Sequence, residues 1–277
     1  MVKTNLSARE IRSIESKWHK IATQLGIPIP PKAAAMILDL EEQDYITYTN
    51  ALEQEKKKVA ERLLQNPQVA TLVDKIARFS QQVTIMGDSI TAYHFSYAEI
   101  LRHLLEPQNI NVTNWGVGGY TSTHALELCH NVALLSLKPD LVFLSYGVND
   151  AKYFGNATKM LVSHEEYHAN MIAVVEALKS QLDATLVLLT PTLVIEAVAN
   201  HRPPGFYHSM RWDNNDLLRF GETLKTIANA YKKVSVVDVT IGIGIPPSPD
   251  LYLDDGVHPN RNGEEVILTQ IAQQLKL

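Results

Sequence analysis

Short apolar runs alternate with segments of helical periodicity from residue 81 onward, and this alternation limits the folds that the chain can adopt. The apolar runs are at residues 83–86, 112–115, 141–144, 184–189 and 234–239. The helical segments between and after them are at about 97–105, 123–135, 163–182, 213–231 and 260–275. Continuous apolar runs are typical of strands buried on both faces, and parallel strands need helical connections of this length. The sequence therefore predicts an α/β sandwich around a parallel sheet.

Glycine and polar residues concentrate in four short segments, at 87–90, 114–119, 147–150 and 255–258. The first three follow predicted strands, and open parallel sheets bind ligands beyond the carboxyl ends of their strands. A serine hydroxyl needs a base before it can act as a nucleophile, and a histidine base needs a carboxylate that holds its tautomer. Ser89, His258 and Asp255 offer these groups. Backbone amides of the glycine turns and the side-chain amide of Asn149 could stabilise an oxyanion.

The four segments read GDSI, NWGVGG, GVND and DGVH, and in them the sequence resembles the SGNH hydrolases, also called GDSL-type lipases and acylhydrolases. The resemblance covers about residues 81–277. It implies that Ser89 is the nucleophile and that Asp255 and His258 complete a catalytic triad. It also implies an oxyanion hole made by the backbone amides of Ser89 and Gly119 and by the side chain of Asn149.

The same resemblance implies a fold and a reaction. The expected fold is a three-layer α/β/α sandwich with a flavodoxin-like parallel sheet of about five strands, and the alternation of strands and helices supports it independently. The expected reaction is the cleavage of carboxylic esters through a covalent acyl-enzyme, with no metal or organic cofactor. The sequence departs from the family pattern at Ile90, where the name-giving leucine would stand, and at Tyr120, where many members have aspartate. Neither change removes a catalytic group.

The first eighty residues differ in character, so we divide the chain into a helical N-terminal region (1–80) and a hydrolase domain (81–277). Ser7 and Glu10 form a capping-box pattern, and apolar residues then recur at helical spacing up to Gly26. These apolar residues are Ile11, Ile14, Trp18, Ile21 and Leu25. Further helices are predicted at 33–40, 45–63 and 67–79, and the charged run 53–58 is expected to be a solvated helix face. We expect these helices to pack on the hydrolase domain or on a second copy of the chain; the alternative is a substrate-covering or partner-docking module.

Composition sets the outer limits on function. The net charge of −5 and the pI of about 6.1 argue against nucleic acid or an anionic membrane as the main partner. The single cysteine, Cys129, excludes an internal disulfide and fits a reducing compartment. No apolar run is long enough for a transmembrane helix, and no apolar signal-peptide segment is found near Met1. We therefore expect a cytoplasmic protein that acts on a small-molecule ester.

The segment between strand 184–189 and the following helix is the predicted specificity loop, because loops at the carboxyl edge of a sheet usually carry recognition. Its mixture of aromatic and cationic side chains favours short-acyl or sugar esters over long aliphatic ones; the alternative is a loop with a purely structural role. His94 is close to Ser89 in the sequence and could also line the pocket. The candidate substrate-binding residues are His94, His201, Arg202, Tyr207, His208 and Arg211.

One competing motif is present. His164, Glu165 and His168 match the H-E-x-x-H pattern of zinc peptidases, in which two histidines one helical turn apart bind the metal. Ser163 and Glu166 form a capping box that would place this pair at an exposed helix start, so the match is interpreted as accidental. The alternatives are therefore a zinc-dependent hydrolase, whose third ligand could be a distant residue such as Glu196, and a non-catalytic interaction module on a hydrolase fold.

Overall fold

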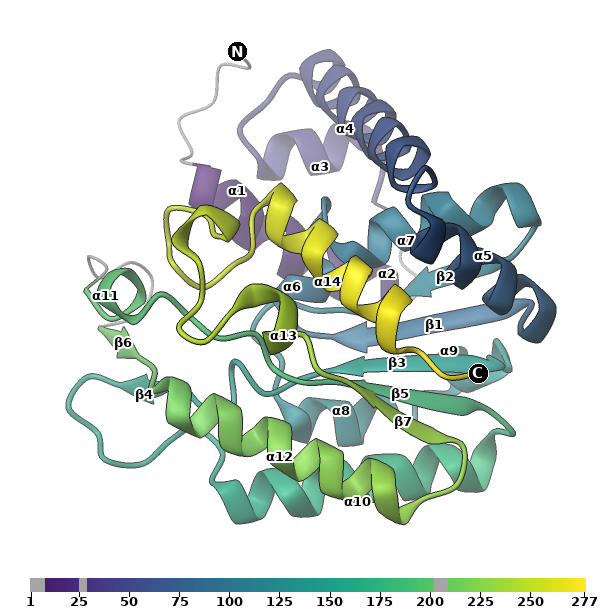
Figure 1. Ribbon diagram of the computed structural model, residues 1–277. Helices are drawn as coiled ribbons and strands as arrows, with labels where there is room; N and C mark the ends of the chain where they lie inside the picture. The colour runs from purple at the N-terminus through teal and green to yellow at the C-terminus, as the bar shows by residue number, and fades with distance from the viewer. Residues whose placement is uncertain (1–7, 25–28, 202–208) are drawn as a thin grey trace.

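A five-stranded parallel sheet forms the centre of the computed structural model, which describes residues 8–24, 29–201 and 209–277 (Figure 1). The strand order is β2-β1-β3-β5-β7, and every neighbouring pair is parallel. The strands are β1 (Gln82–Gly87), β2 (Asn111–Asn114), β3 (Leu141–Ser145), β5 (Thr185–Leu189) and β7 (Val234–Val237). This order is the flavodoxin-like order, so the predicted fold class is confirmed.

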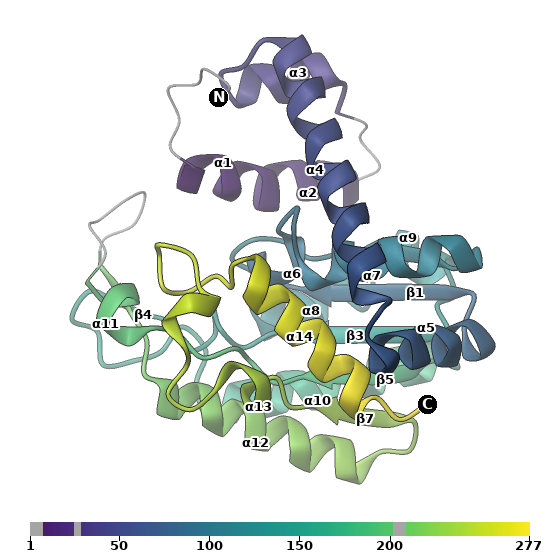
Figure 2. The ribbon, with the colours of Figure 1, turned by 45° about the horizontal axis from the view of Figure 1, so that its top comes forward.

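Helices cover both faces of the sheet (Figures 1 and 2). On one face lie α5 (Pro67–Phe79), α7 (Tyr97–Leu105) and α14 (Arg261–Gln274); on the other lie α8 (Ser122–Leu128), α10 (His164–Gln181) and α12 (Asn214–Ala230). The strands are consequently buried on both sides, and all residues of β5 are buried.

The helix predicted at 123–135 is instead two helices, α8 and α9 (Val132–Ser136). The break lies at Asn131, whose side chain accepts hydrogen bonds from the amides of Ala133 and Leu134 and so begins a new helix. An asparagine favours a helix N-cap over a helix interior, which the apolar periodicity alone did not reveal.

Shorter elements complete the edge of the sheet at which the strands end. They include α6 (Ser89–Ala92), α11 (Glu196–Ala199), α13 (Thr240–Ile243) and the 3₁₀ turn η3 (Pro249–Leu251). Another 3₁₀ turn, η2 (Glu106–Gln108), precedes β2 at the opposite edge. A small antiparallel pair, β4 (Tyr153–Phe154) with β6 (Met210–Arg211), was not predicted. Within the parts of the chain that the structure describes, no helix combines the length and the apolar character needed to cross a membrane.

The N-terminal region begins with three consecutive helical segments, α1 (Ala8–Ile14), the π-helical η1 (Glu15–His19) and α2 (Lys20–Gln24). They are followed by α3 (Pro31–Ile37) and α4 (Glu42–Leu63). The predicted apolar stripe packs here against a small cluster that consists of Ala34, Ala35, Leu38 and Tyr45. Ile11 and Ile14 contribute to this packing, whereas Ser7, Leu25 and the side chain of Trp18 lie outside the described residues.

The last turns of α4 and the whole of α5 share the main core with the sheet. Val59, Leu72 and Ile76 are buried in the same apolar cluster as the residues of β1 and β3. Whether the chain is best divided at residue 80 stays a prediction, as does an association of two copies through the N-terminal helices.

The charged run 53–58 is only partly the solvated face that its sequence predicts, because Lys56 is 3% exposed. Its ammonium group pairs with Glu53 and lies 3.9 Å from the carboxylate of Glu99 on α7. Burial by itself raises the pKa of Glu99, but the charges of Lys20, Lys56 and Arg102 outweigh it and lower that pKa to about 2. A largely buried carboxylate thus joins α2, α4 and α7 through ion pairs.

We predict that Leu72→Ala lowers the free energy of unfolding of the whole protein by about 2–5 kcal/mol, because Leu72 is 1% exposed in the shared core. Urea unfolding followed by circular dichroism measures the change. Lys75→Ala, on the exposed side of the same helix, is the control and should change it by less than about 0.5 kcal/mol. A separate early transition in Leu72→Ala, with the main transition unmoved, would contradict a shared core.

Candidate active site

Ser89 is the first residue of α6 and directly follows β1 and Asp88. The Asp88 carboxylate caps the helix by accepting a hydrogen bond from the Ile90 amide at 2.9 Å. A Cβ atom on Gly87 would lie 2.1 Å from Oγ1 of Thr91, so only glycine allows the strand to turn this tightly into the helix. The turn places the Ser89 hydroxyl at the carboxyl edge of the sheet.

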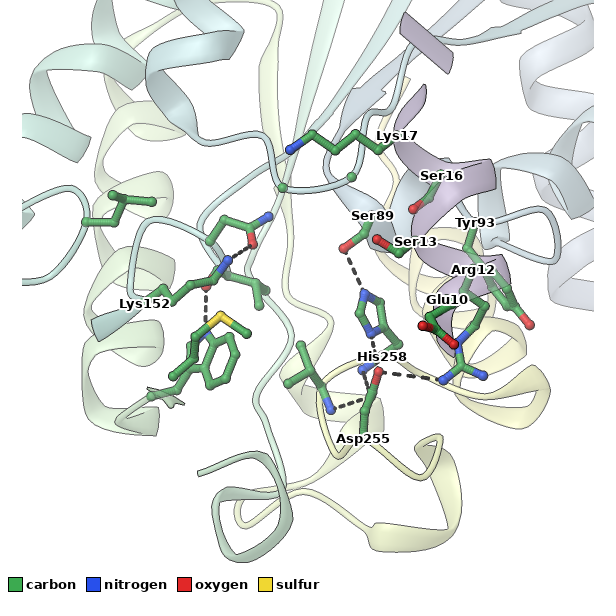
Figure 3. A pocket seen from close by; sticks show the side chains of 18 of the residues that line it. Glu10, Arg12, Ser13, Ser16, Lys17, Ser89, Tyr93, Lys152, Asp255 and His258 are labelled. Atoms are coloured by element: carbon green, nitrogen blue, oxygen red, sulfur yellow. Dashed lines mark hydrogen bonds and ion pairs between the residues drawn. The ribbon is translucent and has the colours of Figure 1, made fainter. Parts of the chain in front are cut away.

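His258 and Asp255 reach Ser89 from a turn that precedes α14. Nε2 of His258 lies 2.8 Å from the Ser89 hydroxyl oxygen, and Nδ1 lies 2.7 Å from Oδ2 of Asp255 (Figure 3). The other carboxylate oxygen accepts the backbone amides of Val257 at 2.9 Å and of His258 at 3.0 Å. These bonds fix the carboxylate on both oxygens and orient the imidazole toward the serine.

Asp255 is 5% exposed, and its environment favours the ionised form. Burial by itself raises its pKa, but the neighbouring His258 charge and the hydrogen bonds from His258 and Val257 hold the pKa well below its usual range. The carboxylate is therefore charged throughout the neutral range and can stabilise an imidazolium ion at His258.

Gly119 and Asn149 lie after β2 and β3, on either side of the strand that leads to Ser89. Gly119 has φ +87°, which glycine adopts without strain. The Asn149 side chain is held at both ends: its Nδ2 donates to the Tyr120 carbonyl at 3.0 Å, and its Oδ1 accepts from Nζ of Lys152 at 2.8 Å. An amide nitrogen carries two hydrogens, so one N–H remains available for a ligand.

A cavity of about 670 Å³ opens at these groups, a volume suited to a small molecule. One wall of the cavity is apolar and contains the aromatic rings of Phe154 and Trp212. The Trp212 indole donates a hydrogen bond to the Val148 carbonyl at 2.8 Å, and Nζ of Lys152 lies about 6 Å from the centroids of both rings. Leu161 and Met210 add to this apolar wall. The opposite wall in Figure 3 is polar and comes largely from α1 and η1, with Glu10, Arg12, Ser13, Ser16 and Lys17.

The polar wall was missed by sequence reasoning. Its residues lie more than seventy positions before Ser89, and nothing local in a helical stripe indicates which site its polar side will face. Met210 and Trp212, by contrast, fall within the predicted specificity loop, although neither was among the candidate residues.

The predicted catalytic residues are brought together, but the predicted substrate-binding residues are not. His94 turns away from the cavity, with Nδ1 2.8 Å from the Glu15 carboxylate and its ring 4.3 Å from that of Tyr93. Arg211 donates to the Ala157 carbonyl at 2.8 Å and stacks on Tyr153. His201 is exposed, and Arg202, Tyr207 and His208 lie outside the described residues.

The three residues of the H-E-x-x-H pattern lie at the start of α10 and do not line the cavity described above. His164, at the start of α10, lies with Nε2 2.9 Å from Oδ1 of Asp216, and Glu165 and His168 are exposed. Glu196 accepts the Asn214 amide at 2.7 Å. Across residues 8–24, 29–201 and 209–277, no group of three or more potential ligands is placed to hold a metal ion.

Residues 85–266, more than half of the chain, match the GDSL-like lipase/acylhydrolase family. The chain belongs to this family. Over 240 residues it is also 21% identical to the isoamyl acetate-hydrolyzing esterase of Schizosaccharomyces pombe, with 84% of this chain and 88% of that protein covered. Together these findings identify a carboxylic ester hydrolase.

Solved structures show the same fold. The lipase/acylhydrolase of Enterococcus faecalis is 19% identical, with a TM-score of 0.54 and coverage of 70% of this chain and 94% of that chain. The acetylxylan esterase Axe2 of Geobacillus stearothermophilus is 22% identical, with a TM-score of 0.53 and coverage of 70% and 93%. At these identities the likeness concerns the fold alone, so the roles of individual residues rest on the geometry of the site.

The buried carboxyl of Asp88 leads to a test of the site's electrostatics. Burial raises its pKa to about 6, against the hydrogen bond from Ile90 and the charges of His258 and Lys152. The folded protein thus keeps a proton that the unfolded chain releases above about pH 4, so this group makes the protein less stable as the pH rises to about 6.

We expect Asp88→Asn, which keeps an acceptor for Ile90, to remove this contribution. The free energy of unfolding of the variant relative to the wild type should rise between pH 4 and 6 by on the order of 2 kcal/mol and stay constant at higher pH. Urea unfolding at several pH values measures it, with the exposed Asp74→Asn as control. A difference that is independent of pH would show that the carboxyl titrates normally.

Proposed function

We propose that this protein is a serine esterase that cleaves carboxylic esters through a covalent acyl-enzyme. The observation that carries the proposal is the chain of contacts from Ser89 through His258 to Asp255, with distances of 2.8 and 2.7 Å. A hydroxyl within hydrogen-bond reach of a base that is itself held by a carboxylate is the arrangement that nucleophilic catalysis requires.

In the proposed reaction the Ser89 oxygen attacks the ester carbonyl while Nε2 of His258 takes the hydroxyl proton. The Asp255 carboxylate stabilises the imidazolium ion that forms. The tetrahedral intermediate collapses when His258 donates that proton to the alcohol oxygen, which leaves an acyl ester on Ser89. Water then attacks this ester with His258 again as the base, and the acid is released.

The negative charge of the intermediate would be bound by the backbone amides of Ser89 and Gly119 and by the free N–H of Asn149. Lys152 supports this role, because its hydrogen bond to Oδ1 fixes the orientation of the amide and leaves Nδ2 as the donor. One such donor is typically worth about 3–4 kcal/mol of transition-state stabilisation.

The two walls of the cavity favour an ester with a short acyl group and a polar alcohol such as a sugar. The apolar wall, with Val148, Met210 and Trp212, suits a small acyl group, and the polar wall from α1 and η1 offers hydrogen bonds to a hydroxylated alcohol. The names of two relatives, an isoamyl acetate-hydrolyzing esterase and an acetylxylan esterase, are consistent with acetyl esters. We also propose that the protein acts in the cytoplasm, because its single cysteine, Cys129, cannot form an internal disulfide.

Ser89→Ala should abolish hydrolysis of p-nitrophenyl acetate while the circular dichroism spectrum and the unfolding midpoint stay unchanged. A fluorophosphonate should label the wild type at Ser89 and leave the variant unlabelled, as detected by mass spectrometry of peptides. Activity that survives Ser89→Ala but is lost with a chelator would favour the zinc-dependent alternative. A folded wild type without turnover would favour the interaction module.

Among p-nitrophenyl esters, we expect kcat/KM to be highest for acetyl to butyryl groups and to fall at least about tenfold for octanoyl. Met210→Ala enlarges the apolar wall and should raise the octanoyl-to-acetyl ratio by roughly tenfold. Arg211→Ala is the matched control, because it lies on the same strand with its side chain bonded to Ala157 and away from the cavity. An equal change in both variants would mean that β6, and not the wall, sets the preference.

A further inference from the structure

The N-terminal helix contacts the turn that carries a predicted oxyanion donor. The Gly118 amide donates a hydrogen bond of 2.7 Å to the main-chain carbonyl of Ser16. Ser16 is only 6% exposed, so water is largely kept from this bond. The acceptor lies outside residues 85–266, the part of the chain that matches the family.

Ser16 lies in the π-helical segment η1, at which the regular helical ladder changes. At the end of this segment the Lys20 amide donates to the Lys17 carbonyl three residues earlier. Single π-helical turns inside helices are often found at functional sites, because they alter the direction of main-chain groups. Here the altered stretch is the one that meets the glycine turn.

The contact is close enough to restrict the residue at position 118. A Cβ atom added to Gly118 would lie 2.7 Å from the Ser16 hydroxyl oxygen, 3.3 Å from its carbonyl oxygen and 3.4 Å from its carbonyl carbon. Positive φ occurs at Gly119 but not at Gly118. The backbone at position 118 is therefore compatible with alanine, and it is the N-terminal helix, at Ser16, that leaves no room for the Cβ atom.

The same helix contacts the turn that carries Asp255. Nη2 of Arg12 lies 3.1 Å from Oδ1 of Asp254 and 3.9 Å from Oδ2 of Asp255, as Figure 3 shows for the second pair. Arg12 is mostly buried along its side chain, with 15% exposed. One helix thus holds the two turns that flank the nucleophile.

We propose that α1 and η1 form a positioning element of the active site, in which the Ser16 carbonyl fixes the oxyanion turn and Arg12 fixes the acid turn. The inference rests on the proposed function. Gly118 and Gly119 have no side chains that could hold this end of the turn, and an oxyanion donor must lie within about 2.7–3.1 Å of the developing charge. A displacement of about 1 Å can reduce the rate by on the order of 10².

The decisive experiment is a double-mutant cycle on the full-length protein. Gly118→Ala should lower kcat by about tenfold or more with KM changed less than about twofold, because the added methyl group pushes the turn from Ser16. In a Ser16→Gly background, where the hydroxyl is gone, the same change should lower kcat by less than about threefold. Gly221→Ala, in α12 with only ordinary contacts to Thr190, is the control for a glycine replacement and should keep full activity.

Arg12 provides a second measurement at the other end of the helix. Arg12→Gln should lower kcat severalfold, and Arg12→Lys should restore most of the loss, because a charge near Asp254 is regained. With p-nitrophenyl acetate, which has no hydroxyl group to meet the polar wall, KM should stay unchanged. A rise in KM with kcat unchanged would instead make Arg12 a substrate-binding residue and would contradict the positioning role.

Hydrogen exchange of the wild type covers the case in which Gly118→Ala fails to fold. The Gly118 amide should exchange much more slowly than a free amide, because it is bonded and buried beneath the helix. The proposal is overturned if this amide is unprotected, or if Gly118→Ala lowers kcat equally in both backgrounds or not at all. If wild-type turnover does not depend on Ser89, the proposed function fails instead.

Discussion

The parallel arrangement of the sheet is the constraint on which the rest of the structure depends. Because all five strands point the same way, their carboxyl ends meet at one edge, and each connection must return across a face of the sheet. The turns after β1, β2 and β3 are adjacent for that reason alone, and they carry Ser89, Gly119 and Asn149. The turn that carries His258 does not follow a strand of the sheet; it precedes α14 and brings His258 to Ser89 at the same edge.

Much of this could be predicted from the sequence because its causes are local. A strand that is buried on both faces appears in the sequence as a short apolar run, and the residues directly after it are those that lie at the carboxyl edge of the sheet. The break at Asn131 was not predicted, because the side chain's capping bonds compete with an apolar periodicity that continues through it. The proposed catalytic groups were indicated by residue type, by spacing and by the resemblance to the SGNH hydrolases, and the distances from Ser89 to His258 and from His258 to Asp255 are within hydrogen-bond range.

The part of the site that was not predicted from the sequence depends on contacts between residues far apart along the chain. Nothing near Arg12 or Ser16 indicates a glycine turn one hundred residues later, just as the charge pattern around Lys56 did not indicate a buried partner on α7. Conversely, Arg211 and His94 have the residue types of a binding site, but one stacks on Tyr153 and the other pairs with Glu15. Residue type suggests what a side chain can bind, and only the fold decides which way it points.

The bond between Gly118 and Ser16 uses main-chain atoms on both sides, and this has a consequence for how such a protein can diverge. Every residue offers the same carbonyl, so position 16 is limited by the size of its side chain and not by its chemistry. Alanine, serine or glycine would all preserve the contact, while a branched or aromatic residue would close the space. A catalytic support of this kind leaves almost no trace in residue identity, and it would be recognised in other proteins by a small residue facing a glycine rather than by a motif.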